Sequence, residues 1–75
     1  MKDANGQVVR LGDRVRLWAN HYGIVVCTFD DGQFSTKYPR SDWGHLKTGA
    51  LIELDSGEIF HYQDSDEDFE VLPAK

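Results

Sequence analysis

Three histidines and a run of acidic residues are the side chains whose types could hold a metal ion. His21, His45 and His61 lie far apart along the chain, and no two of them have the i, i+4 spacing that places two imidazoles on one helix face. The acidic run lacks the central glycine and the terminal glutamate of a calcium-binding loop; its acids are Asp64, Asp66, Glu67 and Asp68. We therefore predict surface histidines, a solvated acidic connector over residues 63–68, no metal ligands and no cofactor.

Nucleophilic catalysis needs an accessible, activated side chain, and the sequence contains one cysteine, Cys27. It lies in the apolar stretch Ile-Val-Val-Cys-Thr-Phe, where burial would raise the pKa of the thiol and remove access to it. No nucleophile elbow or glycine-rich phosphate loop surrounds the serines, which are Ser35, Ser41, Ser56 and Ser65. The sequence thus predicts a protein that is not an enzyme. A lone cysteine, which can form no internal disulfide, favours a reducing, cytoplasmic location.

Aromatic side chains are more numerous than a core of this size requires. The phenylalanines are sufficient for a small core, whereas tyrosine and tryptophan carry polar atoms that suit partly wet binding surfaces. In an acidic chain, exposed rings would suit a cationic ligand or a basic patch on a protein. We predict a binding surface centred on Trp43, with these neighbours: Tyr38, His45, Tyr62, Trp18 and Tyr22. The alternative is that Trp43 plugs one end of the fold and Trp18 the other.

The element that organises the chain is a β-hairpin over residues 47–62. Two apolar runs flank Asp55-Ser56-Gly57, which suits a three-residue turn closed by a left-handed glycine at position 57. This turn pairs Ile52 with Phe60 and Ala50 with Tyr62, so the apolar side chains segregate onto one face. The other face is half-polar and is either solvated or covered by a partner; it carries Leu51, Glu53, Ile59 and His61.

Shorter strands and turns surround this hairpin. We predict a half-buried strand over residues 12–18 and a strand buried on both faces or nearly so over residues 24–29, followed by a two-residue turn at Asp31-Gly32 that pairs Cys27 with Thr36. A three-residue turn is the alternative. Ser41 is a candidate N-cap for one or two helical turns over residues 42–47, and residues 69–72 form a last short strand. Residues 1–7 are expected to be a flexible leader or a short edge segment.

Length and charge limit what the chain can do. At 75 residues it has room for a single small domain, and its net charge of −5 repels a phosphate backbone. Its sequence contains no apolar run of the roughly 20 residues that span a bilayer. We therefore predict one small all-β domain, a five-stranded closed or nearly closed barrel with one short helical turn, that binds neither nucleic acid nor membrane.

Most of the chain resembles SH3-like barrels. The resemblance rests on Gly-Asp-Arg-Val-Arg-Leu at residues 12–17, Gly-Ile-Val-Val at 23–26, the central hairpin and Asp-Phe-Glu-Val-Leu at 68–72. More narrowly, Tyr38-Pro39, Trp43, residues 46–52 and His61-Tyr62 look like small uncharacterised bacterial proteins carried on mobile elements and gene cassettes. That likeness implies the fold and leaves the function open.

The plasmid-borne type II dihydrofolate reductases offer a second resemblance. They are SH3-like barrels of similar length with a Gly-Asp-Arg-Val-Arg opening, which residues 12–16 match. Their pore is lined by a Val-Gln-Ile-Tyr stretch, of which only Tyr62 can be matched here. The sequence therefore predicts a small non-catalytic interaction module that binds a protein partner or forms a homo-oligomer. The alternatives are an enzyme similar to those reductases and an acidic mimic of nucleic acid.

Overall fold

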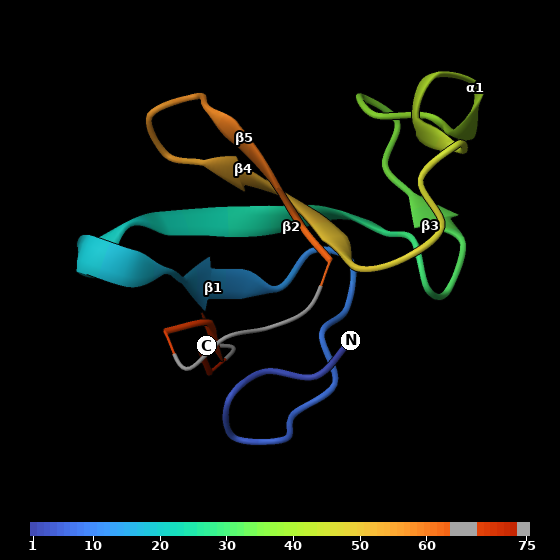
Figure 1. Ribbon diagram of the computed structural model, residues 1–75. Helices are drawn as coiled ribbons and strands as arrows, with labels where there is room; N and C mark the ends of the chain where they lie inside the picture. Colours follow the sequence, from blue (N-terminus) through green and yellow to red (C-terminus); the bar gives the residue numbers. More distant parts are fainter. Residues whose placement is uncertain (64–67, 74–75) are drawn as a thin grey trace.

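The computed structural model describes residues 1–63 and 68–73, which form mainly antiparallel β-sheet (Figure 1). Five strands lie in the order β5-β4-β2-β1-β6, and β3 pairs with β2 outside this path. The elements are β1 (Arg14–Arg16), the 3-10 turn η1 (Trp18–Asn20), β2 (Tyr22–Thr28), β3 (Gln33–Phe34), the helical turn α1 (Arg40–Trp43), β4 (Ala50–Leu54), β5 (Ile59–Tyr62) and β6 (Glu70–Val71). The predicted all-β class is confirmed, with six strands instead of five. Among the described residues the sheet does not close into a barrel by pairing β5 with β6.

The central hairpin has the predicted register. Ile52 pairs with Phe60 and Ala50 with Tyr62, and the Leu54 N–H donates to the Glu58 carbonyl over 2.7 Å. Gly57 has φ +95°, the left-handed conformation that this turn requires. The turn chemistry and the segregation of apolar side chains therefore agreed on one register, and the prediction is confirmed.

The second hairpin differs from both predicted registers. Cys27 pairs with Phe34 and Thr28 with Gln33, so four residues, Phe29-Asp30-Asp31-Gly32, form the turn. The Gly32 N–H donates to the Phe29 carbonyl over 3.2 Å, and Gly32 has φ +65°. The predicted pairing of Cys27 with Thr36 is wrong. Phe29 is buried in an apolar cluster with Cys27 and Leu51 and does not pair with β3, so it becomes part of the turn.

The inner face of the sheet carries the main core. Its buried side chains come from four strands and from the segments beside them: Val9, Val15, Leu17, Val25, Ala50, Ile52, Leu54, Phe69 and Val71. Phe60 and Tyr62 pack against this cluster, and the Tyr62 and Phe69 ring centroids are 5.1 Å apart. Through this contact, the end of β5 meets the residue that precedes β6.

The outer face of the sheet is covered in part by residues 34–46. Tyr38, Trp43 and Leu46 of this segment pack with Cys27 and Leu51 in a second apolar cluster. The helical turn begins at residue 40, two residues before the predicted start, and its N-cap is Pro39 instead of Ser41. Pro39 has φ −76° and ψ 161°, an extended conformation that ends the preceding segment and starts the turn.

Strand β2 is less buried than predicted. Val25 and Cys27 are buried, but Ile24, which lies between β1 and β4 in the sheet, is 44% exposed to solvent. The expectation of burial on both faces is therefore wrong for the first half of β2. Residues 34–46 extend only over the second half of the strand, where Cys27 lies.

The N-terminal segment packs against the C-terminal strand. Lys2 and Val8 form an isolated bridge, and the Ala4 N–H donates to the Phe69 carbonyl over 3.1 Å. The Asp3 carboxylate is buried and accepts hydrogen bonds from the N–H groups of Asn5, Gln7 and Val71 at 2.8 to 3.0 Å. Asp3 therefore ties the first turn of the chain to β6.

Candidate functional site

The structure does not bring the six predicted binding residues together on one surface. Trp43 lies on α1 beside Tyr38, with ring centroids 6.0 Å apart, whereas Trp18 lies near Tyr62 at 6.3 Å. Figure 1 shows α1 at one end of the molecule and the loop between β1 and β2 at the other. His45 is exposed beyond α1, and Tyr22 lies at the start of β2. The aromatic residues thus form two separate groups, with Tyr22 apart from both.

Trp43 is half-buried, so it is neither a fully exposed binding residue nor a fully buried plug at the end of the fold. It packs on the cluster that contains Phe29 and Leu51, and it therefore covers part of the outer face of the sheet. Tyr38 is buried next to it, and the Tyr38 backbone carbonyl accepts a hydrogen bond from the Cys27 Sγ–H over 3.4 Å. Burial raises the pKa of the Cys27 thiol, as expected of an unreactive cysteine.

Tyr38 and Glu53 form a polar contact at the border of this cover. The Tyr38 hydroxyl donates to Glu53 Oε1 over 2.5 Å, and Lys37 Nζ lies 3.1 Å from the same oxygen. The Tyr38 hydroxyl and then Lys37 hold the pKa of Glu53 below its usual value. The same hydrogen bond raises the pKa of Tyr38, and burial adds to the effect. The contact fixes residues 37–38 on β4.

The Trp18 group lies at the far end of the inner face. The Trp18 ring is 4.9 Å from the Phe60 ring and 5.2 Å from the His21 ring, and His21 Nδ1 lies 2.7 Å from the Trp18 carbonyl. Ala19 and Asn20 both have positive φ, +53° and +59°. Left-handed conformations cost free energy for residues other than glycine, so the packing of Trp18 on Phe60 offsets local strain.

Three aromatic rings already have a cation of the chain itself above them. Arg14 lies 5.7 Å from the Tyr22 ring centre, and Lys37 lies 5.7 Å from that of Tyr38. Arg40 lies 4.8 Å from the ring centre of Phe34. These contacts occupy ring faces that a cationic ligand would otherwise use, so the structure gives the cation–π idea little support at Tyr22 and Tyr38.

The uncovered part of the outer face has features of a binding surface. We call it the open face and define it by three residues that are each about two-fifths exposed to solvent: Tyr22 at 38%, Ile24 at 44% and Ile59 at 40%. Three ion pairs lie among these side chains: Arg14 with Asp55 across β2 at 2.6 Å, Arg16 with Glu70 at 2.7 Å and Lys37 with Glu53 at 3.1 Å. Protein interfaces commonly combine exposed apolar side chains with charged groups in this way.

Of these three side chains, the sequence predicts only Tyr22 as part of the binding surface. It predicts for Ile24 a strand buried on both faces or nearly so, and for Ile59 the half-polar face of the hairpin. A signal was present, because Arg14 and Arg16 alternate with buried Val15 and so mark the outer face of the neighbouring strand. Ile24 pairs with Arg14, which places it on that same outer face.

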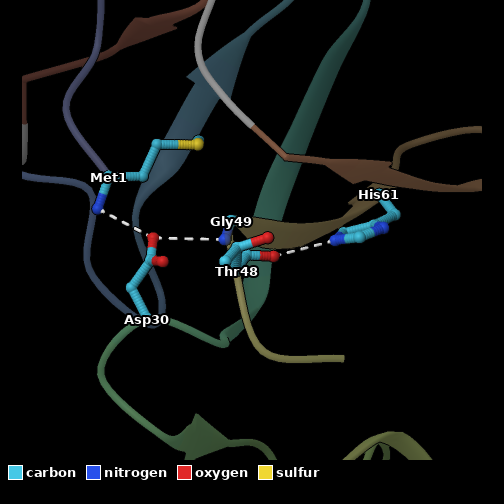
Figure 2. A network of polar contacts seen from close by, with 5 residues as sticks. All are labelled: Met1, Asp30, Thr48, Gly49 and His61. Carbon is cyan, nitrogen blue, oxygen red and sulfur yellow. Dashed lines mark hydrogen bonds and ion pairs between the residues drawn. The ribbon is translucent and has the colours of Figure 1, made fainter. Parts of the chain in front are cut away.

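A polar network joins the N-terminal segment, the second turn and the start of β4 (Figure 2). The Asp30 carboxylate lies 3.3 Å from the Met1 amino group and accepts a hydrogen bond from the Gly49 N–H over 3.1 Å. His61 Nε2 lies 2.9 Å from the Thr48 carbonyl, which can only accept, so Nε2 carries the proton. These contacts hold the backbone at Thr48-Gly49 in place, which is a structural role.

The part of the chain that the structure describes contains neither a cluster of metal ligands nor a membrane-spanning helix. Within residues 1–63 and 68–73, no three histidine, cysteine, aspartate or glutamate side chains gather as a metal site would require. The predicted acidic connector is mostly outside the described residues. In the same part of the chain, no helix has the length and hydropathy to cross a membrane.

Comparison with known proteins adds no relative: the chain matches no protein-family model, no curated protein and no solved structure. Its function must therefore be argued from its own residues.

Proposed function

We propose that this chain is a small, non-catalytic interaction module that binds a protein partner or a second copy of itself. The open face is the observation that carries the proposal. It exposes Tyr22 and Ile24 on β2 and Ile59 on β5, with Glu53 of β4 between the two isoleucines, on a sheet whose neighbouring area is covered by the chain's own residues 34–46. An apolar surface of this kind costs free energy in water, and a partner that buries it would recover that cost.

We further propose that the sheet is that of an SH3-like barrel. Two features support this relationship. The last strand, β6, pairs with the first, β1, and the Tyr62 and Phe69 rings meet across the gap between β5 and β6. A cytoplasmic location belongs to the same proposal and is supported by the free, buried thiol of Cys27.

Photo-crosslinking tests the interaction module. A photoreactive amino acid replaces Tyr22 on the open face, and in a control chain it replaces Val8, which is equally exposed at 42% but lies on the N-terminal segment. Both variants are irradiated in cells that produce the protein, and adducts are separated by mass. We expect discrete adducts from position 22 and none of these from position 8. Absence of adducts at both positions, or the same adducts at both, would contradict the proposal.

A further inference from the structure

Three consecutive backbone N–H groups in the first turn of the chain donate to one residue, Asp3. The Asn5 and Gln7 N–H groups donate to Asp3 Oδ1 over 3.0 and 2.8 Å, and the Gly6 N–H donates to the Asp3 carbonyl over 3.0 Å. Asp3 Oδ2 accepts a hydrogen bond from the Val71 N–H of β6 over 2.9 Å. Asp3 therefore holds both the shape of the turn and its contact with β6.

Asn5 and Gly6, inside this turn, are a pair that can react with each other. The backbone nitrogen of the residue after an asparagine can attack the asparagine Cγ atom, which closes a succinimide ring and releases ammonia. A glycine nitrogen is the least hindered, because glycine has no Cβ atom and a permissive backbone. Asn5 is exposed, and nothing lies within 4 Å of the place that a Cβ atom would take on Gly6, so the ring has space to form.

We propose that Asn5 is a site of spontaneous deamidation, that Asp3 controls its rate, and that the modified turn holds β6 less firmly. The proposal does not depend on the proposed interaction function, because none of these residues belongs to the open face. The reaction needs only the atoms of the chain and water, and ammonia is the leaving group.

Asp3 slows the reaction because the attacking nitrogen is engaged in the folded turn. The Gly6 nitrogen must release the Asp3 carbonyl and lose its proton before it can approach Asn5 Cγ. The N–H groups on either side of it, those of Asn5 and Gln7, are held at Asp3 Oδ1, so the turn must open first. An exposed turn opens locally without unfolding of the sheet. The rate at Asn5 therefore reports how often this turn opens.

Hydrolysis of the ring changes the turn permanently. Water that breaks the bond between the Gly6 nitrogen and Cγ leaves an aspartate, whereas water that breaks the bond to the main-chain carbonyl carbon leaves an isoaspartate. In an isoaspartate one more carbon atom lies in the backbone, between the N–H groups of Asn5 and Gln7 that converge on Asp3 Oδ1. Both products also add a negative charge to the turn that contains the Asp3 carboxylate. These changes weaken the hydrogen bonds of Asp3, including the one from Val71.

Peptide mass spectrometry after incubation at slightly alkaline pH measures the conversion of amide to acid, and Asn20 is the internal control. Asn20 is also exposed, and the N–H that follows it, on His21, also donates to a backbone carbonyl, that of Trp18, over 3.1 Å. The two sites differ in the next residue, because His21 carries a bulky side chain. We expect Asn5 to be converted while Asn20 is retained, and Gly6→Ala should slow the conversion at Asn5.

Two further variants test the control by Asp3. Asp3→Ala removes the carboxylate, and we expect conversion at Asn5 to accelerate by about tenfold, because hydrogen bonds to a charged group no longer close the turn. Asp13→Ala is the matched control: the Asp13 carboxylate accepts from the Arg10 N–H over 2.8 Å in another exposed turn, so its loss should leave the rate unchanged. Thermal unfolding checks that both variants fold. If Asp3→Ala does not fold, the wild-type chain in increasing urea replaces it, and the rate should rise before the sheet unfolds.

Hydrogen exchange tests the consequence for β6. The unmodified and modified wild-type chains are separated by charge, and the Val71 N–H should exchange faster in the modified chain. Conversion at Asn5 no faster than at Asn20 overturns the proposed site. Equal rates in wild type and Asp3→Ala, or a rise in urea only as the sheet unfolds, overturn the control by Asp3. Unchanged exchange at Val71 after modification overturns the effect on β6.

Discussion

On the inner face of the sheet, buried side chains from β1, β2, β4 and β6 pack into one cluster. The outer face differs: residues 34–46 cover only the part that contains Cys27, and surface ion pairs lie over the rest. The backbone where the chain enters β4 also leaves little space for change, because Gly49 lies directly against the Tyr62 carbonyl at the end of β5. Contacts on the outer face involve exposed, solvated charges that contribute little to stability. The difference indicates that the inner face determines the fold and that the uncovered part of the outer face contributes little to it.

The largest effect is expected from Gly49→Ala, where the chain enters β4 beside the end of β5. Gly49 has φ +86°, and a Cβ atom there would lie 1.7 Å from the Tyr62 carbonyl oxygen. That oxygen belongs to the backbone, so it cannot rotate away. We expect a loss of about 4 kcal/mol or more in the free energy of unfolding, enough to unfold a marginal domain.

Gly57→Ala is the matched control for this glycine. Gly57 also has positive φ, +95°, but nothing lies within 4 Å of the position of its Cβ. It should therefore lose only the conformational part, about 1 kcal/mol. Urea unfolding of both variants separates the two costs, and equal losses would show that the contact with Tyr62 is not decisive.

These two glycines also show how much of the fold the sequence could predict. Gly57 was predicted correctly because its turn is local: the spacing from Asp55 determines the conformation. At Gly49 the local sequence indicates only a stop after the helical turn predicted over residues 42–47. Its actual constraint comes from Tyr62, thirteen residues later, and no local pattern reveals such an approach.

The candidate site was less predictable for the same reason. The sequence predicts more aromatic side chains than a small core requires, but their grouping depends on where residues 34–46 fold back over the sheet. This placement depends on the second hairpin, whose register the sequence did not determine. Asp3 was missed as well, although an aspartate two residues before Asn5-Gly6 has the spacing of an Asx turn.

Trp43→Ala tests how firmly residues 34–46 cover the outer face. Trp43 is half-buried on the cluster that contains Cys27, so we expect a loss of about 2 to 3 kcal/mol, less than for a fully buried tryptophan. The Cys27 thiol should be modified slowly in the native wild type, because it is buried and its pKa is raised. In the variant, modification should accelerate. Unchanged thiol modification would mean that Trp43 does not hold the cover in place.

Asp3→Asn tests the contact between the N-terminal segment and β6. Burial alone would raise the pKa of the Asp3 carboxyl, but the N–H groups of Val71, Gln7 and Asn5 outweigh it and hold the pKa below its usual value. An asparagine cannot accept from all three donors, so we expect a loss of about 2 kcal/mol at pH 7.

The loss of stability in Asp3→Asn should depend on pH, because folding lowers the pKa of the Asp3 carboxyl. A carboxyl whose pKa is lowered by folding stabilises the folded state above its unfolded pKa of about 4, and this contribution is lost as the pH falls through the folded value. The difference between wild type and Asp3→Asn should therefore shrink below about pH 4. Urea unfolding at pH 7 and pH 3 measures it, and a constant difference would rule out the ionised carboxylate as its cause.

Glu53→Gln should have the smallest effect on stability, because it lies at the solvated border of the outer face. The Tyr38 hydroxyl donates to Glu53, and this bond, with burial, holds the pKa of Tyr38 above its ordinary value. Replacing the carboxylate with an amide removes the negative charge that opposes ionisation of the phenol, so the pKa of Tyr38 should fall while the free energy of unfolding changes little. Ultraviolet titration of tyrosinate in wild type and variant measures the shift, with Tyr38→Phe to assign it. A large loss of stability without a shift in the pKa of Tyr38 would show that Glu53 is needed to hold the fold together. The contact between Glu53 and Tyr38 would then belong to the strongly stabilised part of the molecule, with the inner face.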